Sequence, residues 1–139
     1  MRLFMTILTL AFLIAAPVRA EDDKALIQRT ISDQIVAFLN DDAETAYSFA
    51  APGIQNRFPD KELFFAMVKK SYAPVYRPGN YAFGRFMLVE RDAMAFQEVL
   101  ITGMDGQDWK AVYKLLRQPD QRWKIGGVGI FPNKDSKGI

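Results

Sequence analysis

The 139-residue sequence contains neither cysteine nor histidine. Without cysteine, no disulfide can stabilise the fold, no thiol can act as a nucleophile, and no N-terminal thiol can carry a lipid anchor. Without histidine, the imidazole base of the common nucleophilic triads is missing. The two absences together remove the ligands that zinc and its neighbours prefer, so we expect neither a metal site nor a cofactor.

Two weaker signals for bound ions are better explained by the fold. Asp41, Asp42 and Glu44 lack the alternating oxygen ligands and central glycine of a calcium loop, and helix capping accounts for these acids. Gly126-Gly127-Val128-Gly129 falls inside an expected strand, whereas a phosphate-binding loop joins a strand to a helix. Neither segment therefore predicts an ion site.

Charge is scarce at the N-terminus, where Arg2 precedes an apolar run from Leu3 to Ala16. Pro17 ends this run, and Val18-Arg19-Ala20 places small residues at the positions that a signal peptidase reads. The run is shorter than the roughly 18–20 apolar residues that cross a bilayer. We predict that Met1–Ala20 is a cleavable signal peptide, that the mature chain is periplasmic or secreted, and that no membrane span remains after cleavage.

The mature chain is then electrically neutral. The 18 basic residues of the full sequence include Arg2 and Arg19, and without these two the basic and acidic residues are equal in number, at 16. A neutral chain without a Lys/Arg cluster gives no indication of nucleic acid binding. A mature length of about 120 residues predicts one domain with one core, which we assign to residues 21–131, followed by a flexible polar tail at 132–139.

Three helices are predicted in the first half of the mature chain, because apolar residues recur there every three or four positions. Capping aspartates and the prolines set their ends. The expected elements are a helix from Asp22 or Asp23 to Leu39, a second at about Asp42–Ala51 capped by Asp41, room for one turn at Ile54–Phe58, a third after Asp60, and an extended connector at Ala73–Asn80. The apolar stripes are Ile27, Ile31, Ile35 and Phe38 in the first helix, and Leu63, Phe64, Met67, Val68 and Tyr72 in the third.

From Tyr81 onward the apolar residues alternate with a period of two, and short polar turns separate the segments, which predicts an antiparallel meander. The expected strands are Tyr81–Glu90, Ala93–Thr102, Trp109–Arg117 and Arg122–Phe131. Gly126 and its neighbouring glycines indicate a bulge or sharp curl in the last strand. The sequence thus predicts an α+β fold, with three N-terminal helices packed on a curled four-stranded antiparallel meander.

The segments that carry a family resemblance are Ala37–Asp42, Phe49–Gln55, Met67-Val68 and Tyr72–Pro78, together with Trp123-Lys124-Ile125 in the last strand. The first four are similar to a bacterial family catalogued as domain of unknown function 4864. The order of elements and the Trp-basic-Ile pattern resemble the cone-shaped fold of the nuclear transport factor 2-like superfamily. The resemblance implies this cone fold and an exported protein, and it implies no chemistry.

Catalytic members of the superfamily use a His–Asp pair, which this chain cannot form, or an acidic base facing a tyrosine. Glu98 is the only acid in the middle of a predicted strand, and it would pair with Tyr113 or Tyr47 in an isomerase or lyase. The alternative is that Glu98 lies on a partly solvated face with Phe96 and Leu100, or pairs with a basic residue across the sheet. Burial would raise the pKa of such a base.

The aromatic connector supplies the other candidate binding residues. Tyr72, Tyr76 and Arg77 lie between the third helix and the first strand, where a cone fold would place them near the rim of its cavity. Tyrosine and arginine bind with apolar bodies and polar tips, so these residues could grip a ligand, with Arg57 as a further member. The alternative is that the tyrosines plug one end of the core and Arg77 caps carbonyls at a helix end. Tyr113, on the inward face of its strand, is the last candidate.

We therefore expect an exported, non-enzymatic module whose cavity or sheet face binds a small apolar ligand or a protein partner. The first alternative is the isomerase or lyase with Glu98 as general base. The second is a structural protein that self-associates as a homodimer.

Overall fold

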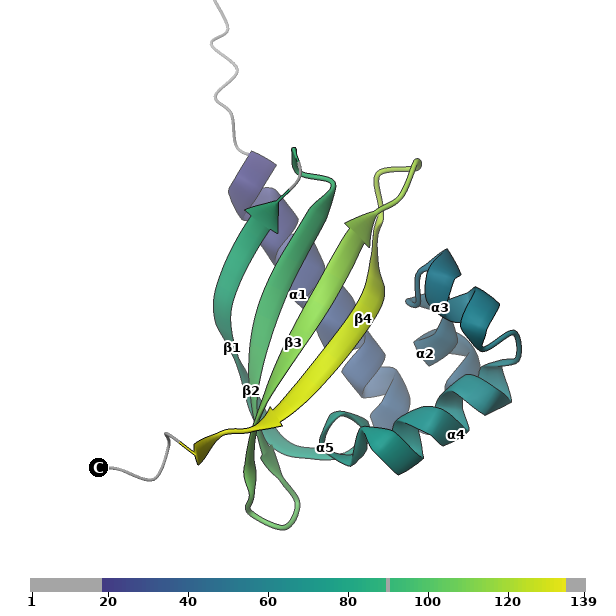
Figure 1. The fold of residues 1–139 in the computed structure, drawn as a ribbon, viewed down its shortest axis with the longest axis vertical. Coiled ribbons are helices and arrows are strands. Elements are labelled where there is room, and N and C mark those ends of the chain that lie inside the picture. Colours follow the sequence, from purple (N-terminus) through teal and green to yellow (C-terminus); the bar gives the residue numbers. More distant parts are fainter. Residues whose placement is uncertain (1–18, 90, 135–139) are drawn as a thin grey trace, which may run out of the picture.

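A computed structural model of the chain describes residues 19–89 and 91–134. Helices come first and a four-stranded antiparallel sheet follows, which confirms the α+β fold; the sheet is curled and does not close into a barrel (Figure 1). The elements are α1 (Arg19–Leu39), α2 (Ala43–Ser48), α3 (Pro52–Arg57), α4 (Lys61–Ser71), α5 (Ala73–Tyr76), β1 (Pro78–Val89), β2 (Met94–Gly103), β3 (Asp108–Arg117) and β4 (Trp123–Pro132). The expected signal peptide, apart from Arg19 and Ala20, and the tail from Asp135 onward lie outside the described residues.

Helix α1 forms the centre of the core, and its predicted stripe is confirmed. Ile27, Ile31 and Ile35 are completely buried and recur every four residues, so that they lie on one face of the helix. The buried amide of Gln34 donates a hydrogen bond of 3.1 Å to the carbonyl of Ala46, which fixes α2 against α1. Helix α1 thus packs across one face of the sheet while α2 and α4 lie beside it (Figure 1).

The strands pair in the order β1-β2-β3-β4, as a meander requires. Besides an irregularity between Pro78 and Asn80 at the start of β1, two bulges interrupt the register. In β1, Gly84 and Arg85 together lie opposite Glu98, and in β4, Gly126 is the extra residue between the partners of Lys114 and Leu115. Bulges increase the local twist, and these two contribute to the curl of the sheet. The bulge predicted from the glycines of β4 is confirmed.

The short helices differ from the prediction in two places. Ala73–Tyr76 is a helical turn and not part of an extended connector, and β1 begins already at Pro78. Pro52 opens helix α3 where a stop was expected. The physical reason is the same in both cases, because proline in the first turn of a helix lacks only an N–H group that would have no partner there.

The apolar stripe of α4 is rotated by about one residue from the prediction. Leu63 is 57% exposed, whereas Phe65, which was not expected in the stripe, is buried. The Phe65 ring lies 5.8 Å from that of Phe38 and 5.6 Å from that of Tyr76, measured between centroids. Contacts with α1 and α5 therefore turn Phe65 inward, and helical period alone does not reveal them.

The capping of α2 also differs by one residue. Asp42, and not Asp41, accepts the hydrogen bond from the Thr45 N–H, at 3.1 Å. Asp41 takes a left-handed backbone conformation, with φ at 52°, and its carboxylate contacts Tyr76 and Arg77 instead.

The N-terminal part of α1 is tied to the sheet by a polar cluster. The buried carboxylate of Asp23 accepts hydrogen bonds from the guanidinium of Arg117, at the end of β3, and from the indole N–H of Trp123, at 3.1 Å. The guanidinium also lies 4.7 Å from the centre of the Trp123 ring. The cluster joins residues about 100 positions apart.

We expect Asp23→Ala to lower the free energy of unfolding by about 2–4 kcal/mol, because it leaves a partly buried guanidinium and an indole N–H without their acceptor. Urea unfolding followed by circular dichroism measures this loss. Asp22→Ala is the control, since Asp22 is exposed, and its effect should stay within about 0.5 kcal/mol. Equal effects of the two changes would contradict an anchoring role for Asp23.

Candidate functional site

The described residues enclose an apolar cleft of about 620 Å³ between strand β4 and helices α3 and α4. Figure 1 shows these helices beyond the β4 edge of the sheet. A hollow of equal volume beside the Asp105–Asp108 turn is lined by polar residues, glycine and proline, and offers no apolar wall. The apolar side chains lining the cleft are Phe38, Ala50, Ile54, Phe58, Phe64, Met67, Val68, Val75, Ile125 and Val128. The cleft is therefore the candidate site.

Main-chain hydrogen bonds fix one end of this cleft. Ala51 N–H donates to the carbonyl of Ile125 and Ile125 N–H donates to the carbonyl of Phe49, both at 2.8 Å. These bonds form a short parallel bridge along the outer edge of β4. They hold the start of α3 against the sheet, since each satisfies a main-chain group of the edge strand.

The far side of α3 is held by Tyr47 of α2. Its hydroxyl donates a hydrogen bond of 2.6 Å to the carbonyl of Phe58, directly after α3. In return, the amide of Gln55 donates to the carbonyl of Tyr47 at 3.1 Å. The helical wall of the cleft is thus built on side chains with satisfied polar groups, which favours a preformed site.

Beyond Ile125, the wall formed by β4 has little side-chain bulk, because Gly126 and Gly127 line the cleft there. A Cβ atom on Gly126 would lie 2.7 Å from the side chain of Leu116, so the bulge accepts only glycine without a shift. A Cβ atom on Gly127 would meet only the Cε atom of Lys114, at 3.9 Å. The two glycines leave room for the Lys114 side chain to lie across the edge strand.

The polar lining of the cleft is cationic and neutral. Arg57, from the last turn of α3, and Lys114 are its charged residues, and Gln34, Ser71 and Tyr72 are its neutral polar ones. Among the described residues, no carboxylate lines the cleft. The side chains of Arg57 and Lys114 have no ion-pair or hydrogen-bond partner within 19–89 and 91–134.

The structure separates the residues predicted from the aromatic connector into two groups. Tyr72 and Arg57 line the cleft. Tyr76 and Arg77 instead lie against the C-terminal end of α1, where the Arg77 guanidinium donates to the carbonyl of Phe38. Arg77 also stacks on the Tyr76 ring at 4.0 Å from its centre. This arrangement matches the structural alternative, in which a tyrosine closes the core and Arg77 caps a helix end.

Asp41 completes this cap. Its carboxylate accepts hydrogen bonds from the Tyr76 hydroxyl and, at 2.8 Å, from the Arg77 guanidinium. The hydrogen bond from Tyr76 and, after it, that from Arg77 hold the pKa of Asp41 below its ordinary value of 3.8. Tyr76 and Arg77, which were predicted near the rim of a cavity, therefore use their polar groups in hydrogen bonds within the protein.

Tyr113 lies in the core and does not line the cleft. It is fully buried on the inward face of β3, and its hydroxyl has no hydrogen-bond partner among the described residues. Burial, with a smaller contribution from Tyr81, raises the pKa of this hydroxyl well above its ordinary value. A phenol in this setting stays protonated at neutral pH.

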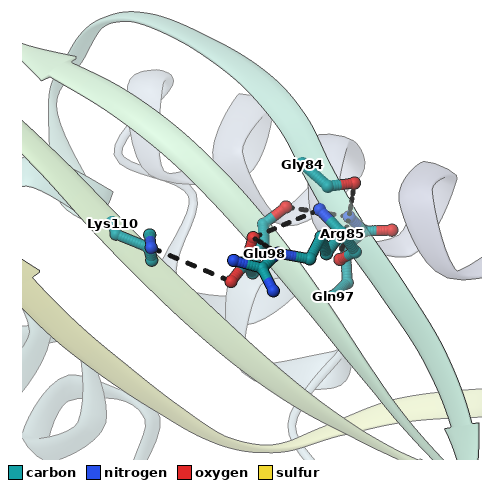
Figure 2. A network of polar contacts seen from close by, with 5 residues as sticks. All are labelled: Gly84, Arg85, Gln97, Glu98 and Lys110. Atoms are coloured by element: carbon teal, nitrogen blue, oxygen red, sulfur yellow. Dashed lines mark hydrogen bonds and ion pairs between the residues drawn. The ribbon is translucent and has the colours of Figure 1, made fainter. Parts of the chain in front are cut away.

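Glu98 lies on the opposite face of the sheet from Tyr113, since its strand neighbours Gln97 and Val99 are the buried ones. Figure 2 shows its carboxylate between Arg85 and Lys110, whose side-chain nitrogens lie 3.7 Å and 4.0 Å from it. The Arg85 N–H donates to it at 3.2 Å. The structure therefore does not bring Glu98 together with Tyr113, one of the two tyrosines named for the isomerase or lyase alternative. The other, Tyr47, has its hydroxyl bound to the carbonyl of Phe58.

Two features of the structure were not predicted from the sequence. Alternation along β3 predicts Lys114 on the outward face of the sheet. Its pairing opposite Gly127 brings it to the cleft. Gln97 is completely buried, and its amide donates to the carbonyls of Arg85 and Glu98, at 3.1 Å and 2.8 Å (Figure 2). The alternation of β2 places this polar residue on the inward face, which indicates a buried polar group. The sequence does not predict its partners, which are main-chain carbonyls beside the β1 bulge.

Across residues 19–89 and 91–134, no group of three or more acidic, cysteine or histidine side chains could hold a metal ion. None of the helices in these ranges combines the length and apolarity needed to cross a membrane.

Comparisons with known proteins give a family and a fold. The model of a family described as a domain of unknown function, DUF4864, matches residues 20–138. No curated protein matches the sequence. A 2.5 Å structure of a protein from Catenulispora acidiphila is similar, with a TM-score of 0.52 and 16% sequence identity, over 84% of this chain and 95% of that chain. At this identity the likeness shows a shared fold alone.

We expect Tyr76→Phe to raise the pKa of Asp41 toward 3.8, because it removes the hydrogen bond that lowers this pKa most. Since the pKa of Asp41 is lower in the folded state than in the unfolded state, its contribution to stability is present above the unfolded pKa and is lost as the pH falls through the folded pKa. The variant should therefore lose part of this contribution at neutral pH, and the difference from wild type should shrink in acid.

A carboxyl NMR titration of Asp41 measures the shift. Tyr72→Phe is the matched control, because the Tyr72 hydroxyl has no hydrogen-bond partner in the described part of the chain. If Tyr72→Phe moved the Asp41 pKa as much as Tyr76→Phe, the assignment of Tyr76 to the helix cap would be wrong.

Proposed function

This chain belongs to the DUF4864 family, and we propose that it is an exported, non-enzymatic module that binds a small apolar ligand in the cleft between β4 and helices α3 and α4. The observation that carries the proposal is the cleft itself. Its volume of about 620 Å³ lies within the range of roughly 300–1,000 Å³ that is common for small-molecule sites. Its walls are mainly apolar, with a few polar groups at defined places.

The chemistry of the chain supports binding over catalysis. Glu98 is held on the other face of the sheet by two cations. The chain also lacks histidine and cysteine.

The finer fold family and the export of the chain are part of the same proposal. A long first helix across a curled antiparallel sheet, with Trp123 opening the last strand, supports a cone of the nuclear transport factor 2-like type. The apolar run before Pro17, and a family match that starts at residue 20, support cleavage after Ala20.

We expect the protein recovered from the periplasm or the medium of an expressing bacterium to begin at Glu21. Intact mass and N-terminal sequencing measure this directly. Replacing Leu10 with Arg should block export, because a charge in the apolar run prevents its recognition as a signal. A full-length chain in the cytoplasmic fraction of both forms would contradict export.

We expect Gly53→Trp to weaken ligand binding by about tenfold or more, because Gly53 lines the cleft and an indole there would take up part of its space. A Cβ atom on Gly53 meets no atom within 4 Å, so the larger side chain enters open space and leaves the fold intact. The probe is N-phenyl-1-naphthylamine, an uncharged apolar dye whose fluorescence rises on binding.

Ala66→Trp is the matched control, since Ala66 is exposed on α4 and does not line the cleft. It should leave dye binding unchanged. Absence of dye binding to the wild-type protein, or equal binding by all three forms, would dispose of the cleft as a ligand site.

A further inference from the structure

The two charged residues that line the cleft are both cations. Elsewhere in the described residues, six basic side chains form ion pairs with acids. These pairs are Lys61–Glu44, Arg77–Asp41, Arg85–Glu98, Lys110–Glu98, Arg117–Asp23 and Arg122–Asp120. Arg57 and Lys114 line one apolar cleft and have no such acid. A cleft with positive charge and no compensating carboxylate is complementary to an anion.

The position of Lys114 depends on the glycines beside it. Lys114 pairs with Gly127 in the sheet, and its Cε atom lies 3.4 Å from the place that a Cβ atom on Gly126 would take. The apolar stem of the lysine therefore lies beside bare main chain of the edge strand, and Lys114 lines the cleft from there. A bulkier residue at either glycine would compete with the lysine for this space.

Arg57 supplies the second cation from the helical side. It is the last residue of α3, it is exposed, and its guanidinium can bind a carboxylate through two parallel hydrogen bonds. Tyr72, an uncharged polar residue, belongs to the same lining. The cleft thus combines groups that recognise an anionic head with a wall that accepts an apolar tail.

We propose that the ligand is an amphiphile with one carboxylate head and an apolar tail, bound with its head at Arg57 and Lys114 and its tail along Met67, Ile125 and Val128. This inference rests on the proposed function, because it assigns a ligand class to the same cleft. A neutral head would leave both cations without a partner, and a cationic head would be repelled by them. Charge therefore selects among ligands that the apolar wall alone would accept equally.

The experiment compares three probes with the same ten-carbon tail: decanoate, 1-decanol and decyltrimethylammonium, each below its aggregation concentration. Displacement of N-phenyl-1-naphthylamine measures the affinities. Decanoate should bind about tenfold or more tightly than either of the other probes at low ionic strength. Added salt should weaken decanoate binding relative to decanol, because it screens the head-group contacts.

The variants Arg57→Gln and Lys114→Gln should each lower decanoate affinity by about 3- to 10-fold, and the double variant should abolish the preference over decanol. Decanol affinity should stay unchanged in all three, which shows that the apolar wall is intact. Lys70→Gln is the charge-matched control, because Lys70 is exposed on α4 and does not line the cleft. It should change nothing.

The failures of the two proposals are distinguishable. If the dye binds and decanoate, decanol and the cationic probe compete equally, the carboxylate assignment is wrong and the apolar site stands. The same conclusion follows if the double variant keeps the decanoate preference, or if the dye binds and no ten-carbon probe displaces it. If neither the dye nor any probe binds the wild-type protein, the ligand-binding function itself is overturned.

Discussion

Each end of helix α1 is fixed by an arginine that stacks on an aromatic ring and binds a carboxylate. Near the N-terminal end, Arg117 lies over Trp123 and binds Asp23 of the helix. At the other end, Arg77 lies over Tyr76 and binds Asp41, directly after the helix. In a chain without disulfides, these two clusters complement the apolar stripe of α1, because burial alone is non-directional and does not set where along the sheet a helix stops.

The position of α1 decides where an open space can remain. The helix fills the sheet face with completely buried side chains such as Ile31 and Ile35, and Tyr113 occupies the same interior. These side chains fill the interior between the helix and the sheet. The candidate cleft lies at the edge of β4, where the Ala50–Ile125 bridge holds the helical wall at one point. An edge strand offers such a place because nothing is obliged to pair with it along its whole length.

Regular periodicity made much of the fold predictable, and long-range contacts limited the rest. The spacing of Ile27, Ile31 and Ile35 sufficed to find α1 and its buried face, and alternation with polar turns sufficed to find the meander. The site was only partly predictable, because Tyr72 and Tyr76 are alike in sequence and only the distant Asp41 distinguishes them. Lys114 could not be found by alternation, which assigns a side chain to a face of the sheet and does not show that it lines a cleft beside β4.

Glycine at position 126 links the shape of the sheet to the charge of the cleft. As a bulge residue it shifts the register between β3 and β4, and as a residue without a side chain it leaves the path that Lys114 takes. Glycine in a strand costs stability, so a pair of glycines beside an apolar cleft is better explained by the space that they open than by the strand itself. The mature chain has no net charge to attract an anion. Lys114 and Arg57 would attract an anion locally, because the field near two unpaired cations does not depend on the charge of the whole chain.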